Sequence, residues 1–200
     1  MGQIRKVCVY CGSSPGTDPA FLAAAARLGE ILADNGVGLV YGGGSGGLMG
    51  ALATAMRARG GEIVGVIPDF LTARENMFKG ATEIVVTSGM HDRKRVMFER
   101  SDAFVALPGG IGTLEELVEQ LTWAQLGRHR KPILIANIKG FWDGLLAVFG
   151  HMGRNGYIHS AERLNYLVVD SVEKILPALR AAAPEREDER EGERAAIERM

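Results

Sequence analysis

The chain has 200 residues, of which 46% are hydrophobic and 24% are charged, a composition typical of one globular domain with a substantial core. The net charge of −1 gives no electrostatic reason to expect a nucleic-acid or membrane partner. No apolar run approaches the ~20 residues that span a bilayer. No signal-peptide pattern precedes the first predicted strand, so we expect a cytoplasmic protein.

Apolar segments of β type alternate with helical patterns along the chain. The predicted strands cover residues 7–11, 37–41, 63–67, 83–87, 103–107, 133–136 and 166–169. The predicted helices cover residues 19–35, 48–59, 91–100, 114–126, 141–152 and 172–180, and a loop runs from the third strand to about residue 81. Strands that are apolar throughout and separated by helices indicate a parallel sheet covered on both faces. With right-handed crossovers, this pattern predicts an α/β, Rossmann-like, doubly wound single domain.

The C-terminal segment differs in composition from the rest of the chain. Residues 185–200 contain six Glu, one Asp and four Arg and almost no apolar side chains. Such a segment cannot bury enough apolar surface to offset the entropy of ordering it. We therefore expect one nucleotide-binding domain over residues 1–182 and a charged, disordered tail over residues 183–200, outside the chemistry.

Two cysteines, Cys8 and Cys11, have C-x-x-C spacing. A redox pair of this kind opens a helix, whereas Cys8 lies inside a predicted strand. Residues three apart on a strand also point to opposite faces, and two thiols alone do not complete a zinc site. We expect both cysteines to be reduced and structural, and we expect no metal.

The most informative segment follows the predicted strand 103–107. It passes through Pro108 and three glycines, and we predict that a helix opens at Thr113. A strand–glycine–helix junction of this kind directs unpaired backbone N–H groups and the positive end of a helix dipole at one spot, which attracts a phosphate. Glu115 and Glu116 lie in the first helical turn. The segment therefore predicts an enzyme that acts on a phosphorylated small molecule, with a carboxylate near the reacting bond.

The same segment has a structural interpretation. Thr113-x-x-Glu116 is a capping box, in which the Thr accepts from a helix N–H and the Glu reaches back to the backbone of the Thr. On spacing alone, Glu116 is as readily a capping residue as a catalytic one. Pro108 and the preceding glycines favour ligand binding, because a plain cap does not need them.

Two other small-residue turns follow the first and second predicted strands. The second turn contains G-x-G-x-x-G at Gly42, Gly44 and Gly47, with Asp69 about 20 residues further on, so a nicotinamide-dependent oxidoreductase is an alternative. The match is weak because the turn follows the second strand and is rich enough in glycine to fit by chance. A P-loop is excluded, since the G-K-[ST] ending is missing. The first turn carries Ser14, which either donates to a ligand or only forms the turn.

A basic segment opens the predicted helix 91–100. Cations such as Arg93 and Lys94 oppose the helix dipole near a helix N-terminus, so something is expected to compensate them. An anionic substrate is one interpretation, and a solvated basic face is the other. His91 as a general base is a weaker alternative.

Together these segments resemble the LONELY GUY (LOG) family of cytokinin riboside 5′-monophosphate phosphoribohydrolases, many of which carry the label lysine decarboxylase. The matching segments are Val9-Tyr10-Cys11-Gly12-Ser13-Ser14, Tyr41-Gly42-Gly43-Gly44, Gly47-Leu48-Met49-Gly50, Met90-His91-Asp92-Arg93-Lys94, the P-G-G-x-G-T-x-x-E motif from Pro108 to Glu116, and Thr122-Trp123-Ala124-Gln125-Leu126-Gly127. The resemblance implies a Rossmann-like homodimer that hydrolyses the N-glycosidic bond of AMP or N6-substituted AMP. It implies functional roles for Arg93, Lys94 and Glu116, and for an acidic loop residue that Glu75 matches best.

The residues and the resemblance together give one hypothesis of mechanism. The expected catalytic residues are Glu116 and Arg93, and the expected substrate-binding residues are Ser14, Gly43, Gly44, Glu75, Lys94, Gly109, Gly110, Ile111, Gly112, Thr113 and Glu115. Glu116 stabilises the ribosyl cation and orients water, while Arg93 orients Glu116. We expect no cofactor, and no lysine lies in a Schiff-base context for a decarboxylase. A nucleotide-binding module without catalysis remains the other alternative.

Overall fold

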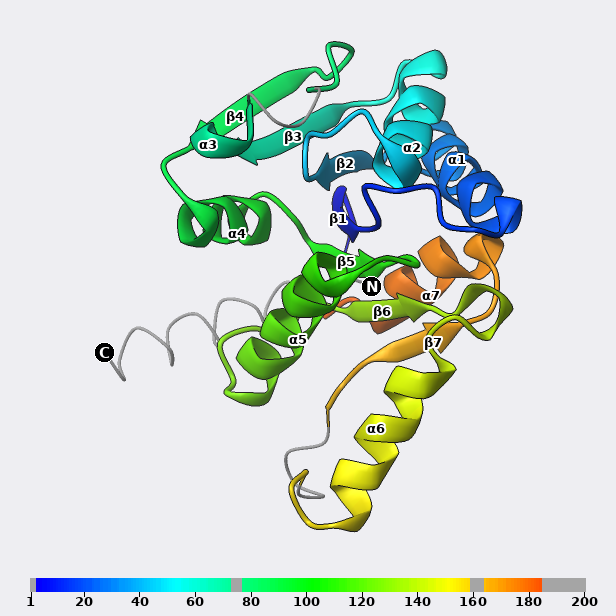
Figure 1. The fold of residues 1–200 in the computed structure, drawn as a ribbon, viewed down its shortest axis with the longest axis vertical. Coiled ribbons are helices and arrows are strands. Elements are labelled where there is room, and N and C mark those ends of the chain that lie inside the picture. The colour runs from blue at the N-terminus through cyan, green and yellow to red at the C-terminus, as the bar shows by residue number, and fades with distance from the viewer. Residues whose placement is uncertain (1–2, 73–76, 159–163, 185–200) are drawn as a thin grey trace.

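A computed structural model describes residues 3–72, 77–158 and 164–184. Within these residues, seven strands form one sheet and helices cover both of its faces (Figure 1). The strands are β1 Lys6–Tyr10, β2 Gly38–Tyr41, β3 Ile63–Pro68, β4 Glu83–Thr87, β5 Ala103–Ala106, β6 Ile133–Ala136 and β7 Leu167–Val169. The helices are α1 Pro19–Asp34, α2 Gly47–Ala58, α3 Asp69–Thr72, α4 Met90–Glu99, α5 Ile111–Gln125, α6 Asp143–Arg154 and α7 Ile175–Ala182, with 3₁₀ turns η1 Ile138–Gly140 and η3 Val172–Lys174.

The sheet is parallel throughout, with the strand order β4-β3-β2-β1-β5-β6-β7. The first strand therefore lies in the middle, where it pairs with β2 on one side and with β5 on the other. The chain winds outwards in one direction before β5 and in the other after it, which makes the β1–β5 boundary the topological switch point. This arrangement confirms the predicted Rossmann-like, doubly wound α/β fold.

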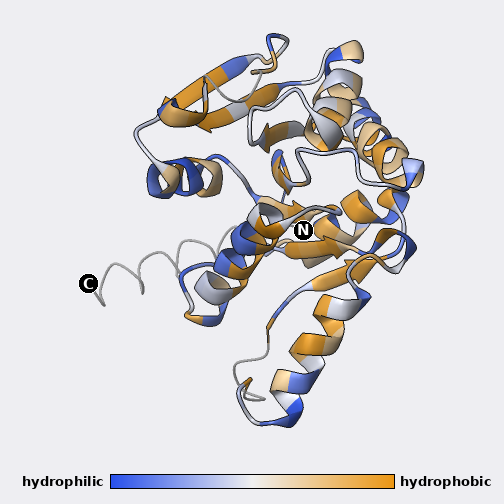
Figure 2. Ribbon diagram, viewed as in Figure 1, coloured by the Kyte–Doolittle hydropathy of each residue, from blue (hydrophilic) through white to orange (hydrophobic). Residues whose placement is uncertain are grey.

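Side chains alternate between the two faces of the sheet, as the period of a strand requires. From β1, Val7 and Val9 point into a core shared with α1, α2 and α7. Cys8 and Tyr10 point into a second core shared with α4, α5 and α6. The strands are hydrophobic, whereas α4 is largely hydrophilic (Figure 2). Cys11 lies with Val7 and Val9, so the two cysteines occupy opposite faces; both are buried and free, as predicted.

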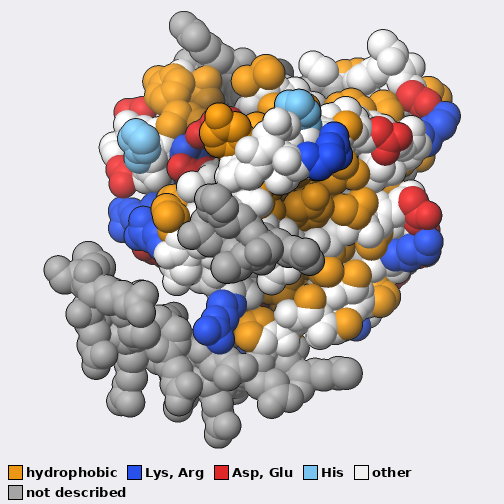
Figure 3. All heavy atoms as spheres, turned by 90° about the horizontal axis from the view of Figure 1, so that it is seen from below, with side chains coloured by type: hydrophobic (Ala, Val, Ile, Leu, Met, Phe, Trp, Pro, Cys, Tyr) orange, Lys and Arg blue, Asp and Glu red, His pale blue; other side chains and the backbone are white. Residues whose placement is uncertain are grey.

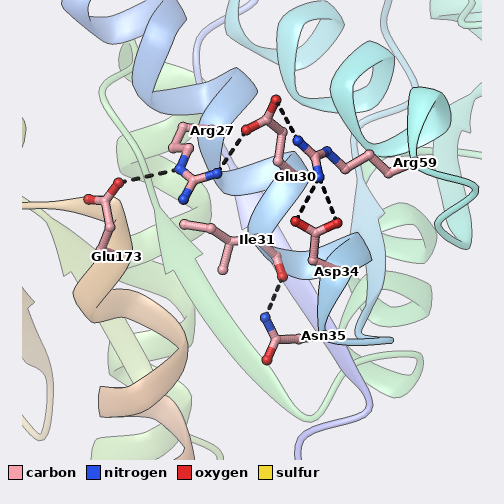
Figure 4. Close-up of polar contacts among 7 residues, drawn as sticks. All are labelled: Arg27, Glu30, Ile31, Asp34, Asn35, Arg59 and Glu173. Atoms are coloured by element: carbon pink, nitrogen blue, oxygen red, sulfur yellow. Dashed lines mark hydrogen bonds and ion pairs between the residues drawn. The ribbon is translucent and has the colours of Figure 1, made fainter.

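Charged side chains on α1 and α2 pair at the surface (Figure 4). Arg27 contacts Glu30 at 2.9 Å and Glu173 at 3.5 Å, and Arg59 contacts Glu30 at 3.4 Å and Asp34 at 2.9 Å. The side chains of all five residues are at least one-third exposed. Exposed pairs of this kind contribute about 0–1 kcal/mol each, so the packing of α1 against α2 depends on the apolar residues beneath them.

Several element boundaries differ from the sequence prediction. The helix predicted to open at Thr113 begins at Ile111, and the helix predicted over 141–152 covers Asp143–Arg154. The loop predicted before residue 81 contains the short helix α3, and the helix predicted over 172–180 is divided into η3 and α7. Propensity signals place helix ends only to within a few residues.

The C-terminal boundary of the domain stays a prediction. The last helix, α7, ends at Ala182. The predicted tail falls almost entirely on residues 185–200, which lie outside the described residues. In the part of the chain that the structure does describe, no helix is both long and apolar enough to cross a membrane.

Candidate active site

A cavity of about 280 Å³ lies at the carboxyl ends of the central strands. Its walls come from β1 and the turn after it, from Gly42 just after β2, and from the helices α2, α4 and α5. This is the crevice beside the switch point of the sheet, where open α/β folds bind their ligands. A second cavity, of about 370 Å³, adjoins it and shares Gly12, Ser13 and Gly110 with it.

The N-terminus of α5 forms one wall of the first cavity. Gly110 is the N-cap, in an extended conformation, and no side chain caps the helix. The N–H groups of the first turn, from Ile111 onwards, lack partners within the helix and lie at its positive end. Thr113 is the third helical residue, so the predicted capping box with Glu116 is wrong. The Thr113 side chain instead packs beside Gly109, where an added Cβ would lie 2.1 Å from Thr113 Oγ1.

Glu116 points into the cavity from the buried side of α5. Its side chain is only 10% exposed, and its Oε1 atom lies 3.4 Å from a terminal nitrogen of Arg93. Burial raises the pKa of Glu116 from 4.5 to about 7, although the positive charge of Arg93 acts in the opposite direction. A carboxyl group with this pKa exchanges protons near neutral pH, which is the range that general acid–base catalysis uses.

Arg93 reaches Glu116 from α4 across the end of β2. Its Nε donates to the carbonyl oxygen of Val66 at 3.1 Å, which fixes the direction of the guanidinium group. The guanidinium passes directly over Gly42, where an added Cβ would lie 2.4 Å from Arg93 Nη2. A side chain at position 42 would displace the Arg93 guanidinium, which gives a packing reason for this glycine of the G-x-G-x-x-G turn.

Lys94 also leaves α4 towards α5, but it pairs with other carboxylates. Its Nζ lies 2.5 Å from Glu115 Oε1 and 2.9 Å from Glu119 Oε1, and the residue is only 6% exposed. Partial burial lowers the pKa of Lys94, but the hydrogen bonds to the two carboxylates outweigh it and raise the pKa above its usual value. The solvated basic face is thus wrong for Arg93 and Lys94, because carboxylates of α5 compensate both cations.

The structure brings together only part of the predicted set. The predicted residues that line the first cavity are Arg93, Gly110, Ile111, Gly112, Thr113, Glu115 and Glu116. Ser14 and Gly109 line the adjoining cavity, Lys94 lies behind Glu115, and Gly43 and Gly44 line neither cavity. Glu75 lies outside the described residues. His91, the weaker candidate for a base, is exposed in the first turn of α4 and lines neither cavity.

Other residues line the cavity without having been predicted. Tyr10, the last residue of β1, contributes a buried aromatic wall, and Met49, Met90 and Met97 contribute sulfur-containing side chains. In the sequence each of these fits an ordinary core position, since each lies in an apolar or amphipathic pattern. Only the meeting of three elements at one sheet edge shows that they border a cavity.

The alternative of a nicotinamide-dependent oxidoreductase gains little from the geometry. The G-x-G-x-x-G turn follows β2 and therefore lies one strand away from the switch point. Gly47 has a φ of 53° and packs against the backbone of Ser13, where an added Cβ would lie 2.4 Å from the carbonyl carbon. Two of the three glycines, Gly42 and Gly47, are thus explained by packing within the protein.

Comparison with known proteins decides the family. A family model described as "possible lysine decarboxylase" matches residues 49–179. The cytokinin riboside 5′-monophosphate phosphoribohydrolase LOG of Oryza sativa subsp. japonica is 42% identical over 185 residues, which cover 92% of this chain and 76% of that protein. Its relative LOG2 of Arabidopsis thaliana is 39% identical over 186 residues, which cover 93% of this chain and 87% of that protein. The chain belongs to the LOG family.

Solved structures share the fold of this LOG family member at low sequence identity. The molybdenum cofactor binding protein of Rippkaea orientalis is 20% identical, with a TM-score of 0.67 over 90% of this chain and 97% of that chain. DNA processing protein A of Helicobacter pylori is 14% identical, with a TM-score of 0.57 over 90% of this chain and 81% of that chain. Likenesses at this level of identity concern the fold alone.

The description of the family model as a possible lysine decarboxylase finds no support in the site. A lysine that forms a Schiff base must lose its proton, which requires a lowered pKa. Among the described residues that line the two cavities there is no lysine, and Lys94, which contacts the lining residue Glu115, has a pKa raised by two carboxylates. The ionisable pair that lines the cavity of this LOG family member is Glu116 with Arg93.

Proposed function

We propose that this protein hydrolyses the N-glycosidic bond of AMP or of an N6-substituted AMP, a cytokinin riboside 5′-monophosphate. The products are the free base and ribose 5-phosphate. The observation that carries the proposal is Glu116, a buried carboxyl with a pKa of about 7 that faces a cavity at the uncapped N-terminus of α5. The names of its relatives within the LOG family support the same reaction.

The phosphate of the substrate binds at the start of α5. Backbone N–H groups of residues 110–113 point towards it, and the helix dipole favours its negative charge. Gly12 and Ser13 line both cavities together with Gly110, the residue that begins α5, and therefore lie next to the proposed phosphate position. In our proposal Ser14 and the peptide of Gly109, which line the adjoining cavity, complete the surroundings of the phosphate, whereas Gly43 and Gly44 line neither cavity and take no part. A remote phosphate held in this way positions the ribose against Glu116, so that phosphate binding contributes to the rate as well as to affinity.

The reaction proceeds at the anomeric carbon. The C1′–N9 bond breaks with its electron pair going to the purine, which gains a proton from solvent, and positive charge develops on the ribose. The carboxylate of Glu116 stabilises this charge and accepts a proton from the attacking water as the new O–C1′ bond forms. Arg93 holds the carboxylate in place, since the two side chains are in contact at 3.4 Å.

The base lies among flexible apolar side chains in this proposal. Met90 and Met97 come from α4 and Met49 comes from α2, and all three line the cavity. Unbranched thioether side chains adapt to ligands of different shape. These side chains can therefore admit an N6 substituent, each well-packed methylene group of which changes transition-state binding by about 1–3 kcal/mol.

We also propose that the protein is a homodimer in the cytoplasm. Apolar residues on α5 are strongly exposed, with Ile111 at 81% and Val118 at 40%, and Val148 on α6 is 46% exposed. The face seen from below likewise carries hydrophobic side chains in its middle (Figure 3). Light scattering should give twice the mass of one chain. Val118→Glu should produce a monomer if α5 forms the interface, and Val148→Glu should do so if α6 forms it. The buried free thiols suit a reducing compartment.

The decisive experiment measures free adenine released from AMP by chromatography. Wild-type protein should release adenine from AMP and very little from adenosine, because adenosine lacks the phosphate anchor. Glu116→Gln should fold normally and lose about a hundredfold or more in kcat. Arg27→Gln, at the exposed surface of α1, is the matched control and should keep full activity. Tight AMP binding without adenine release would support a binding module instead, and NAD binding that depends on Asp69 would support an oxidoreductase.

A further inference from the structure

Lys94 on α4 is shared by two carboxylates that lie one helical turn apart on α5. Its Nζ donates to Glu115 Oε1 at 2.5 Å and to Glu119 Oε1 at 2.9 Å, and only 7% of its side chain is exposed. One carboxylate is enough to compensate one buried cation, so the second one calls for an explanation. The two carboxylates flank Glu116 along α5, which makes Glu116 a residue that their charges affect.

Glu119 is the carboxylate of this group that lies away from the cavities. Glu115 lines the first cavity, whereas Glu119 lines neither of the two, so it does not contact a ligand bound there. Its side chain is 21% exposed, and its Oε2 atom is buried without a hydrogen-bond partner among the described residues. Water screens a charge enclosed in this way only partly, so the charge acts on neighbouring groups inside the protein.

The charges around Glu116 balance before its own charge is counted. The charged groups that act on it are two cations of α4 and two carboxylates of α5: Arg93, Lys94, Glu115 and Glu119. The strand β1 adds three ionisable groups that burial keeps uncharged by raising their pKa values: Cys8, Tyr10 and Cys11. The helix α2 contributes only the apolar Met49 to the cavity walls. A protonated Glu116 therefore leaves the group neutral, and an ionised Glu116 makes it negative.

We propose that Glu119 is a positioning residue that acts on Glu116 through Lys94. Together with Glu115 it occupies the charge of Lys94, so that Arg93 is the one cation of this group left to stabilise an ionised Glu116. Glu116 then binds a proton more readily, which makes its carboxylate a stronger base towards the attacking water. The inference rests on the proposed function for this last step, whereas the effect of charge is measurable in the protein without substrate.

The first experiment titrates Glu116 in the protein without substrate. Glutamate labelled with ¹³C at the side-chain carboxyl is followed by NMR, and the signal that is missing in Glu116→Gln identifies Glu116. The wild-type midpoint should lie at about 7. Glu119→Gln should lower the midpoint by about half a unit, because it removes one negative charge while its amide oxygen still accepts from Lys94. Lys94→Gln should raise the midpoint by about as much, because it leaves both carboxylates uncompensated.

The opposite signs of these two shifts separate an effect of charge from a loss of structure. A variant that only loosens the site admits water, which lowers the pKa of Glu116 towards its ordinary value of 4.5 in either case. Glu30→Gln on α1 is the matched control, because it also removes a carboxylate that accepts from a basic side chain. The midpoint of Glu116 should be unchanged in Glu30→Gln. Shifts of the same sign in Glu119→Gln and Lys94→Gln, or an unchanged midpoint in Glu119→Gln, would overturn the assignment.

The second experiment measures the pH dependence of kcat/KM for AMP in the same variants. The step near pH 7 should move to lower pH in Glu119→Gln and to higher pH in Lys94→Gln, by the amounts that NMR gives. At pH 8, KM of Glu119→Gln should stay within a factor of two of the wild type, because Glu119 does not contact the substrate. NMR shifts without a matching movement of the rate profile would overturn the role of Glu119 in the reaction. If the wild type released no adenine, the proposed function would fail, while opposite NMR shifts would still establish the coupling of charges.

Discussion

The two faces of the sheet bury different kinds of side chain. On the face covered by α1, α2 and α7, the core is made of aliphatic and aromatic residues, cysteine and methionine, and the charged groups pair at the surface. The face covered by α4 and α5 buries ionisable and polar groups as well. Every buried Ser, Thr, Gln, His, Lys or Glu among the described residues lies on β4, α4, α5 or the segment after one of these helices: Thr87, Lys94, Ser101, Thr113, Glu116, Gln120 and His129.

The difference separates the residues that hold the fold from those to which our proposal assigns the chemistry. Burying a charge costs free energy unless a partner compensates it, so a protein built for stability alone would bury none. On the α4–α5 face the compensation is incomplete, because the pKa of Glu116 is raised to about 7 even with Arg93 beside it. A carboxyl group that is difficult to ionise lowers the stability of the fold near neutral pH. The same raised pKa suits a general acid or base that works near neutral pH.

The largest effect should come from removing core volume on either face. Leu28 on α1 and Leu117 on α5 are both fully buried. Leu28→Ala and Leu117→Ala should each lower the free energy of unfolding by about 2–5 kcal/mol, as measured by urea denaturation. Only Leu117→Ala should also lower kcat of the folded enzyme, because it loosens the helix that carries Glu116. A similar loss of kcat in Leu28→Ala would contradict the division between the faces.

Removing the carboxyl group of Glu116, whose pKa is raised, should stabilise the protein above neutral pH. With a pKa of about 7 in the folded state and 4.5 as its ordinary value, Glu116 holds its proton more tightly when folded. Unfolding then releases a proton between these values, and stability falls as pH rises from 4.5 to 7. Glu116→Gln should be more stable than the wild type by up to about 3 kcal/mol at pH 8 and about equal at pH 4.5. Thermal melting of the variant and the wild type at pH 8 and at pH 4.5 measures this difference in stability. Equal melting temperatures of the two proteins at pH 8 would argue against the raised pKa of Glu116.

The rate of AMP hydrolysis should follow the ionisation of Glu116. If ionised Glu116 accepts the proton of water, kcat/KM for AMP should fall about tenfold for each unit of pH below 7. The second ionisation of the AMP phosphate, near pH 6, adds a separate step at lower pH. The residual activity of Glu116→Gln should lack the step near 7. A rate that rises below pH 7 would instead make Glu116 the proton donor.

Changes at the exposed ion pairs of α1 should have the smallest effect. Glu30 lies between Arg27 and Arg59, and its side chain is 34% exposed. Glu30→Gln should lower the free energy of unfolding by no more than about 1 kcal/mol, with kcat unchanged. Denaturation at low and at high salt provides the check, because the small loss should shrink as salt screens the pairs. A loss of several kcal/mol would mean that this surface contributes more than its exposure suggests.

The sequence predicted the fold well because the decisive signals are local. The parallel sheet follows from apolar strands such as Ala103–Ala106 that alternate with glycine turns and amphipathic helices. This pattern can be recognised without knowing which helix packs against which strand. The prediction failed at the start of α5, where we expected the helix to open at Thr113 and it begins at Ile111. The extended backbone of Gly110 begins that helix without a side-chain cap, a feature that depends on conformation and not on residue type.

Site residues were predictable where a motif named them and were missed where only contact reveals them. Glu116 and Arg93 came from motifs, but their meeting needs α4 and α5 to pack side by side. The burial of Lys94 between two carboxylates depends on the same packing, which no helical pattern records. Tyr10 was missed because a tyrosine at the end of an apolar strand is the pattern of an ordinary core residue.

The central place of β1 has a consequence for how the protein is made. The first strand is synthesised before the other strands of the sheet, yet one of its two edges finds its partner only when Ala103–Ala106 has emerged. Until then a bare strand edge is open to pairing with other chains. A nascent chain that ends before β5 therefore lacks the wall of the crevice that α5 provides, and a co-translational chaperone that shields the open edge of β1 should raise the yield of active enzyme.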